Sequence, residues 1–156
     1  NLFHDIGGFD GSFFAHLEEI DLCWRLKRAG YKIMVRPKSV VYHVGGGTLD
    51  YENPRKTYLN FRNSLYTLVK NEPISKLLWL IPLRLVLDGV AGAMFLMKGQ
   101  FKNIGAIFKA HWHFFPKIAR LLQQRKVVKE WIDRTSISSV SNESGRLNRS
   151  IIWQFY

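Results

Sequence analysis

Three carboxylates within four positions are the residues of this chain best suited to acid–base chemistry. Glu18, Glu19 and Asp21 stand among apolar residues that we expect to be buried. Burying a carboxylate is costly unless it is paired or tuned for proton transfer. His43 follows at the end of the apolar run Val40–Tyr42 and is a potential metal ligand. The spacing therefore predicts an acidic helix and a metal-ligating histidine on consecutive elements, as in half of an active site.

The acids are predicted to lie on a helix over residues 13–29, because apolar residues recur there at three- and four-residue steps. Asp21 precedes Arg25 by four residues, which is the favourable order for an ion pair on one helical face. Glu19 is rotated by about 100° from Glu18 and need not join that pair. It is therefore the candidate general base, although acids alone are more often a solvated helix face.

Further elements follow from composition. The glycines within residues 5–12 predict a loop there, and short strands are predicted at 31–35 and 39–44. The second strand is followed by three glycines, which suit either a close approach to a ligand or a plain loop. A helix is predicted over residues 54–70, with an apolar stripe along one face.

The bulk composition suits one modest domain with an anionic partner. The chain has 156 residues, of which 47% are hydrophobic, and a formal net charge of +11. Residues 98–129 hold eight Lys or Arg and no acid, whereas five of the twelve acids fall in the first 21 positions. Because the first residue is Asn1 rather than Met, and Leu2 and Phe3 have the pattern of an element's interior, we expect a fragment of a longer chain.

The second half of the chain has the composition of membrane-associating helices. Residues 77–97 are almost wholly apolar, but Arg84 and Asp88 lie within them and argue against a simple transmembrane span. These two residues share a helical face and could pair. Residues 101–122 predict a basic amphipathic helix, kinked before Pro116, that binds a membrane surface or packs on the protein.

Several motifs in the first 70 residues together resemble one enzyme family. They are Ile6–Asp10 with Phe13–Phe14, Glu18–Arg25, Ala29–Tyr31, Pro37, and His43 with Gly45–Thr48. The set resembles the C-terminal half of the catalytic domain of bacterial family 2 glycosyltransferases, of the rhamnosyltransferase-like group. The resemblance implies the α/β GT-A fold for residues 1–70 and, more loosely, membrane-associating helices over 71–134, while the Ser- and Asn-rich composition of residues 135–156 predicts a flexible tail.

The resemblance also implies a reaction. It is an inverting transfer of a sugar from a nucleotide-sugar donor to a hydroxyl of a saccharide or lipid-linked saccharide, in surface polysaccharide synthesis. The motif assigns the base to Glu19, with Glu18 as the alternative because most relatives carry the shorter Asp at position 19. His43 matches a histidine that completes a Mg²⁺ or Mn²⁺ site in some members. The family's Asp-x-Asp metal motif does not occur in this sequence, so we expect the fragment to be inactive alone.

The other residues of the candidate site have more modest expected roles. Asp21 and Arg25 are expected to hold the catalytic helix. Asp10 and Gly8 are expected on the acceptor side, and Trp24 in the core rather than under a sugar ring. Arg62 is expected either to contact a phosphate or to lie on an ordinary helix surface.

Three rival functions fit parts of the sequence. A non-enzymatic basic membrane-binding module would use residues 77–129 alone. A nucleic-acid binder is disfavoured because the apolar face of residues 101–122 is too continuous for a groove-reading helix. A metal hydrolase using Glu18, Glu19 and His43 lacks the usual three or four ligands. We therefore expect a peripheral or monotopic enzyme on the cytoplasmic face of the bacterial inner membrane, with an anionic membrane surface and no nucleic acid as partner.

Overall fold

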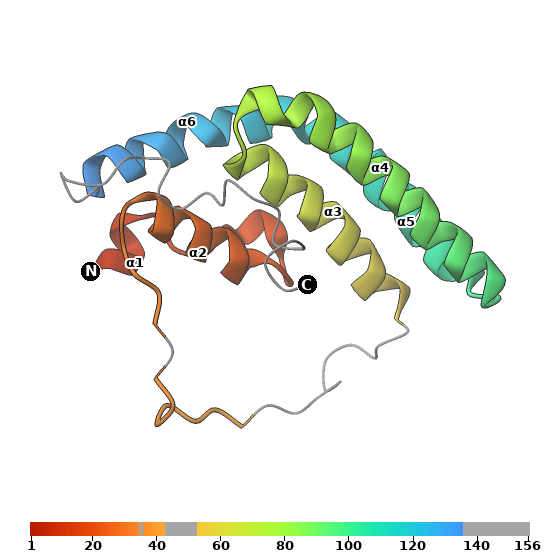
Figure 1. Cartoon of the computed structure of the whole chain (residues 1–156), viewed down its shortest axis with the longest axis horizontal. Coiled ribbons are helices and arrows are strands. Elements are labelled where there is room, and N and C mark those ends of the chain that lie inside the picture. Colours follow the sequence, from red (N-terminus) through yellow and green to blue (C-terminus); the bar gives the residue numbers. More distant parts are fainter. Residues whose placement is uncertain (35, 43–52, 136–156) are drawn as a thin grey trace, which may run out of the picture.

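The computed structural model describes residues 1–34, 36–42 and 53–135, and every regular element within these ranges is helical. Figure 1 shows a short N-terminal part packed under a layer of longer helices. The elements are α1 (Leu2–Asp5), η1 (Gly11–Phe13), α2 (Glu18–Arg28), α3 (Pro54–Asn71), α4 (Ile74–Met97), α5 (Phe101–Phe114), η2 (Phe115–Lys117) and α6 (Ile118–Thr135).

The predicted α/β fold is wrong, because the two expected strands do not form within residues 31–34 and 36–42. A strand needs a neighbouring backbone to complete its hydrogen bonds, and no described segment pairs with these residues. Apart from Tyr31, which packs against the core, their apolar side chains are exposed, with Met34 at 84% and Tyr42 at 95%. The expected GT-A sheet is wrong for the same reason, because these two strands were expected to belong to it. Position 35 and residues 43 and 44 lie outside the described residues.

Helix α3 is the centre of the structure and confirms the helix predicted at residues 54–70. Asn53 caps it by accepting a 2.8 Å hydrogen bond from the backbone N–H of Arg55, and Pro54 suits the first turn. The helix packs against α2, α4, α5 and α6. It therefore links the acidic N-terminal part to the apolar second half. One core cluster forms around it: Phe13, Leu65, Tyr66, Val69, Phe114 and Leu121.

The predicted basic helix over residues 101–122 is two helices, α5 and α6, joined by the turn η2. The break falls at Pro116, which has no N–H to continue the helical ladder, so the expected kink is confirmed. Helix α6 then runs across α2 and closes a second core cluster, made of Ile6, Leu22, Ala29, Val128 and Ile132. The tail predicted from residue 135 begins where α6 ends, and residues 136–156 lie outside the described part of the chain.

Helix α4 folds back on α5 and leaves most of its apolar side chains in solvent. Leu78 is 78% and Val86 64% exposed, and Asp88 is the only buried residue of the helix. The expected pair is confirmed, with Arg84 Nε 2.6 Å from Asp88. His111 of α5 lies 2.8 Å from the other Asp88 oxygen, so the buried carboxylate faces α5. By length and mean hydropathy (1.8) α4 could cross a membrane.

Candidate functional site

Helix α2 begins with the acid pair, five residues later than the sequence predicts. The cause is the backbone before it, because Phe14, His16 and Leu17 have φ values of 65°, 67° and 70°. Side chains other than glycine rarely adopt this left-handed region, and each such residue costs about 1–3 kcal/mol. The strained loop of residues 14–17 places Glu18 and Glu19 in the first turn of α2.

Two neighbouring side chains of α3 hold this part of the chain in place, Asn63 the loop itself and Arg62 the η1 turn just before it. The Asn63 amide nitrogen donates to the carbonyl oxygens of Phe13, Ala15 and His16 at 3.0, 2.8 and 2.8 Å. Arg62 donates to the carbonyl of Phe13 at 2.9 Å and to the Asn63 side-chain oxygen. Arg62, predicted either to contact a phosphate or to lie on an ordinary helix surface, therefore has its guanidinium engaged with η1 and with Asn63. The role of Asn63 was not identified from the sequence, because no local pattern points to its distant partners.

The two glutamates of the first turn differ in their surroundings. Glu19 is exposed, as expected of a carboxylate that does not join the Asp21–Arg25 ion pair, whereas Glu18 is half-buried. One oxygen of Glu18 and the Nε2 atom of His16 are buried without a hydrogen bond to any described residue. Carboxylates in a first turn interact favourably with the helix dipole. The arrangement therefore offers an accessible carboxylate beside polar atoms that still lack partners.

Asp21 is the centre of a buried charge network rather than a solvent-facing acid. Its carboxylate is 0% exposed and accepts hydrogen bonds from Arg25 (3.0 Å), Lys70 (2.9 Å) and Asn71 (2.8 Å). The predicted Asp21–Arg25 pair is thus confirmed. Arg25 also donates to the carbonyl of Gly8 at 2.6 Å, so the network fixes the glycine loop to α2. Asp21 positions the helix of the acid pair.

The fourth charge of the network, Asp10, lies at the edge of a cavity. Lys70 Nζ is 2.7 Å from Asp10 Oδ2, and the Ser12 N–H donates to Oδ1 at 2.8 Å. Burial alone would raise the pKa of Asp10, but the charge and hydrogen bond of Lys70, together with Ser12, hold it below its usual 3.8. Asp10 is therefore ionised at neutral pH and balances Lys70.

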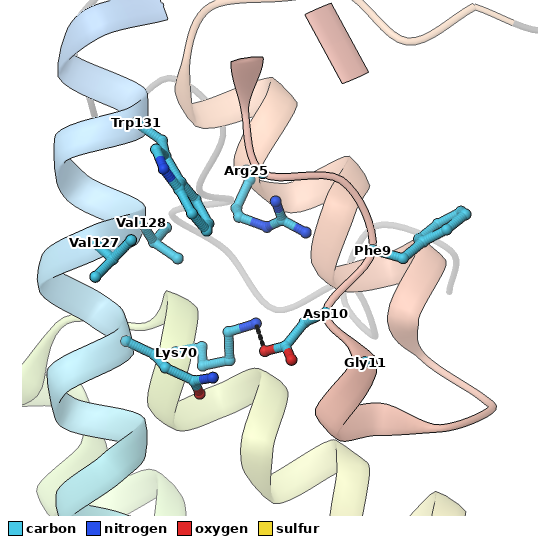
Figure 2. A pocket seen from close by; sticks show the side chains of 10 residues that line it. Phe9, Asp10, Gly11, Arg25, Lys70, Val127, Val128 and Trp131 are labelled. Carbon is cyan, nitrogen blue, oxygen red and sulfur yellow. Dashed lines mark hydrogen bonds and ion pairs between the residues drawn. The ribbon is translucent and has the colours of Figure 1, made fainter. Parts of the chain in front are cut away.

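The cavity is about 330 Å³ and lies between the glycine loop, α2, α3 and α6. Figure 2 shows Trp131, Val127 and Val128 of α6 facing Arg25, Lys70 and Asp10. Of the predicted substrate-binding residues, the structure brings Asp10 and Arg25 into its wall, while Gly8 contributes the carbonyl bound by Arg25. The full lining is Gly7, Phe9, Asp10, Gly11, Arg25, Lys70, Gln124, Val127, Val128 and Trp131.

The remaining predicted site residues lie elsewhere. Trp24 is half-buried, with its indole N–H buried and without a partner in the described ranges, and it does not line the cavity. His43 lies outside the described residues. Among the residues that the structure places, no three His, Cys, Asp or Glu side chains gather as a metal site. The expected Mg²⁺ or Mn²⁺ site and the role of His43 in it stay predictions.

No family model, curated protein or solved structure matches this chain. A function for it therefore has to come from its own residues. The features with chemical potential are the acid pair on its strained loop, the charge-balanced cavity beside Asp10, and the exposed apolar face of α4.

Proposed function

We propose that this chain carries the proton-accepting part of an inverting glycosyltransferase that works at a membrane surface. The supporting observation is the strained loop of residues 14–17, which α3 pins through Asn63 and which presents Glu19 to solvent. A general base must be accessible to an incoming hydroxyl and yet held rigidly. A surface acid on an ordinary helix would need neither left-handed backbone nor hydrogen bonds from another helix to the loop before it.

In the proposed reaction the acceptor hydroxyl attacks the anomeric carbon of a nucleotide-sugar. A bond forms between the acceptor oxygen and that carbon as the bond from the carbon to the diphosphate oxygen breaks. The hydroxyl proton passes to the Glu19 carboxylate, and the nucleoside diphosphate leaves with the electron pair, so the configuration inverts. Asp21 and Arg25 keep α2 in place during this step. No step uses a metal at His43.

The exposed face of α4 supports the membrane location of this proposal. Apolar side chains at 50–80% exposure form a patch that is large for a soluble protein, and α5 adds Phe108 at 70% and Trp112 at 79%. The basic residues between 98 and 129 complement anionic lipid headgroups. We place the protein on the cytoplasmic face of a bacterial inner membrane, where a lipid-linked saccharide acceptor would lie beside it.

The test of the proposed base is Glu19→Gln, which keeps the size of the side chain and removes its ability to take a proton. In the complete gene product that contains this sequence, transfer from a radiolabelled nucleotide-sugar should fall about 10²- to 10⁴-fold. Fold and membrane binding should be unchanged, because Glu19 is exposed.

The matched control is Glu18→Gln, which changes the neighbouring half-buried acid in the same way. We expect a smaller loss of transfer. A larger loss for Glu18→Gln would move the base to Glu18. Unchanged transfer in both variants would contradict the proposed role of the acid pair.

The second candidate function is a non-enzymatic membrane-binding module. The exposed apolar face of α4 favours it, since that face needs no catalytic residue. Both functions predict membrane binding, so only the glutamate variants separate them. In the module, Glu19→Gln has no functional consequence at all.

Membrane attachment itself is tested on α4. The double variant Leu78→Glu with Val86→Glu should weaken co-flotation with phosphatidylglycerol-containing vesicles by about tenfold or more, because each side chain loses apolar burial and adds a charge. Met34→Glu is the control, since Met34 is an equally exposed apolar residue away from α4. Equal losses in both proteins, or none in the α4 variant, would rule out α4 as the attachment face.

A further inference from the structure

The cavity beside Asp10 has charged residues in its wall, but their charges are already balanced by one another. Lys70 bonds to Asp10 and Asp21, and Arg25 bonds to Asp21 and to the carbonyl oxygens of Ile6 and Gly8. The two cations are therefore balanced by two carboxylates. An anionic ligand would face the Asp10 carboxylate without gaining an unpaired cation, so the cavity is unsuited to a phosphate or a nucleotide.

Gln124, one of the residues that line the cavity, carries a polar atom that still lacks a partner among the described residues. The side-chain oxygen of Gln124 is buried and makes no hydrogen bond to any described residue. A buried polar atom is costly to leave unsatisfied. This oxygen and the carboxylate of Asp10 both accept hydrogen bonds, so a ligand with at least two hydroxyls could donate one hydrogen bond to each.

The rest of the wall is apolar and partly aromatic. Trp131, Val127 and Val128 line the α6 side (Figure 2). The volume of about 330 Å³ lies at the small end of the range of about 300–1,000 Å³ for small-ligand pockets. An apolar wall with a few convergent hydrogen-bonding groups fits a ligand with one C–H face and several hydroxyls.

We propose that this cavity binds a neutral sugar unit of the acceptor saccharide, with Gln124 and Asp10 as hydrogen-bonding residues and Trp131 as the apolar wall. The inference rests on the proposed transferase function and extends it to the substrate class. The link is structural, because the loop that lines the cavity at Phe9 to Gly11 continues through η1 into the loop of the acid pair.

The experiment measures binding without transfer. Rhamnotetraose, galactotetraose and maltotetraose are titrated into the full chain, with saturation-transfer NMR as the readout and tetragalacturonate and inorganic phosphate as anionic probes. At least one neutral tetrasaccharide should bind, and Gln124→Leu should weaken it tenfold or more. Gln123→Leu is the matched control, because Gln123 is the exposed neighbour on α6.

A second variant guards against a folding defect in the first. Gly11→Leu adds a side chain at a cavity-lining position where a Cβ meets no atom within 4 Å, so it should obstruct the cavity. Trp131 is not used, because its ring packs directly over Gly7. Absence of binding by all three neutral probes, preference for an anionic probe, or equal binding by Gln124→Leu and Gln123→Leu would each overturn the inference.

The Glu19→Gln protein separates this inference from the transferase proposal. It should bind the same tetrasaccharide as the wild type while transferring no sugar. If the complete wild-type gene product bound the tetrasaccharide but transferred no sugar, the sugar site would stand and the transferase function would be ruled out. If instead the wild type and Gln124→Leu transferred sugar with the same KM, the sugar site would be ruled out and the transferase function would stand.

Discussion

Replacing Asp21 by Asn should lower the free energy of unfolding by about 3–5 kcal/mol. The substitution keeps the shape of the side chain but removes its charge at a position that is 0% exposed. Arg25, at 1% exposure, then loses its only ion-pair partner in the described structure, and Lys70 keeps Asp10 alone. An uncompensated buried cation is among the costliest defects of a protein interior. Urea denaturation followed by far-ultraviolet circular dichroism measures the loss.

A compensating variant distinguishes lost charge balance from lost packing. Adding Lys70→Met to Asp21→Asn removes one cation with the anion, so that Arg25 and Asp10 balance again. The double variant should be more stable than the sum of the two single losses predicts. Asp5→Asn is the control, because Asp5 is 58% exposed in its pair with the N-terminus and should change stability by no more than about 0.5 kcal/mol. Simple additivity would contradict the charge-balance explanation.

The sequence was sufficient for features that depend on local spacing. Helix α3 follows from its apolar periodicity and from the Asn53–Pro54 start, and the pairs Asp21–Arg25 and Arg84–Asp88 follow from a four-residue step. These interactions are decided within one or two helical turns, so the chain needs no tertiary contact to specify their geometry.

The features that the sequence could not supply all depend on distant segments. The apolar runs at residues 31–34 and 39–42 have strand-like composition, but a strand also requires a partner that the described fold does not provide. Lys70 joins Asp21 from 49 positions away. The late start of α2 depends on loop contacts from Asn63, 47 residues beyond His16. Periodicity contains no information about such contacts.

The loop before the acid pair gives a structural reason why these distant contacts matter for function. Residues with left-handed backbone persist only where the surrounding structure determines them more strongly than their own preference. Asn63 is 0% exposed and holds the loop through hydrogen bonds to the carbonyl oxygens of Ala15 and His16, and to that of Phe13 just before it. If the loop relaxed, α2 could extend toward its N-terminus, as the sequence pattern favours, and Glu18 and Glu19 would no longer lie in its first turn.

Asn63→Ala should therefore reduce transfer by at least tenfold in protein that is still folded, besides lowering the free energy of unfolding by about 2–3 kcal/mol. Asn103→Ala is the matched control, since Asn103 is 3% exposed and its side chain bonds Thr57 at 3.0 Å, away from the loop. It should lose comparable stability and keep full transfer. If both variants lost transfer only in proportion to the unfolded fraction measured by circular dichroism, the anchored loop would have a purely structural role.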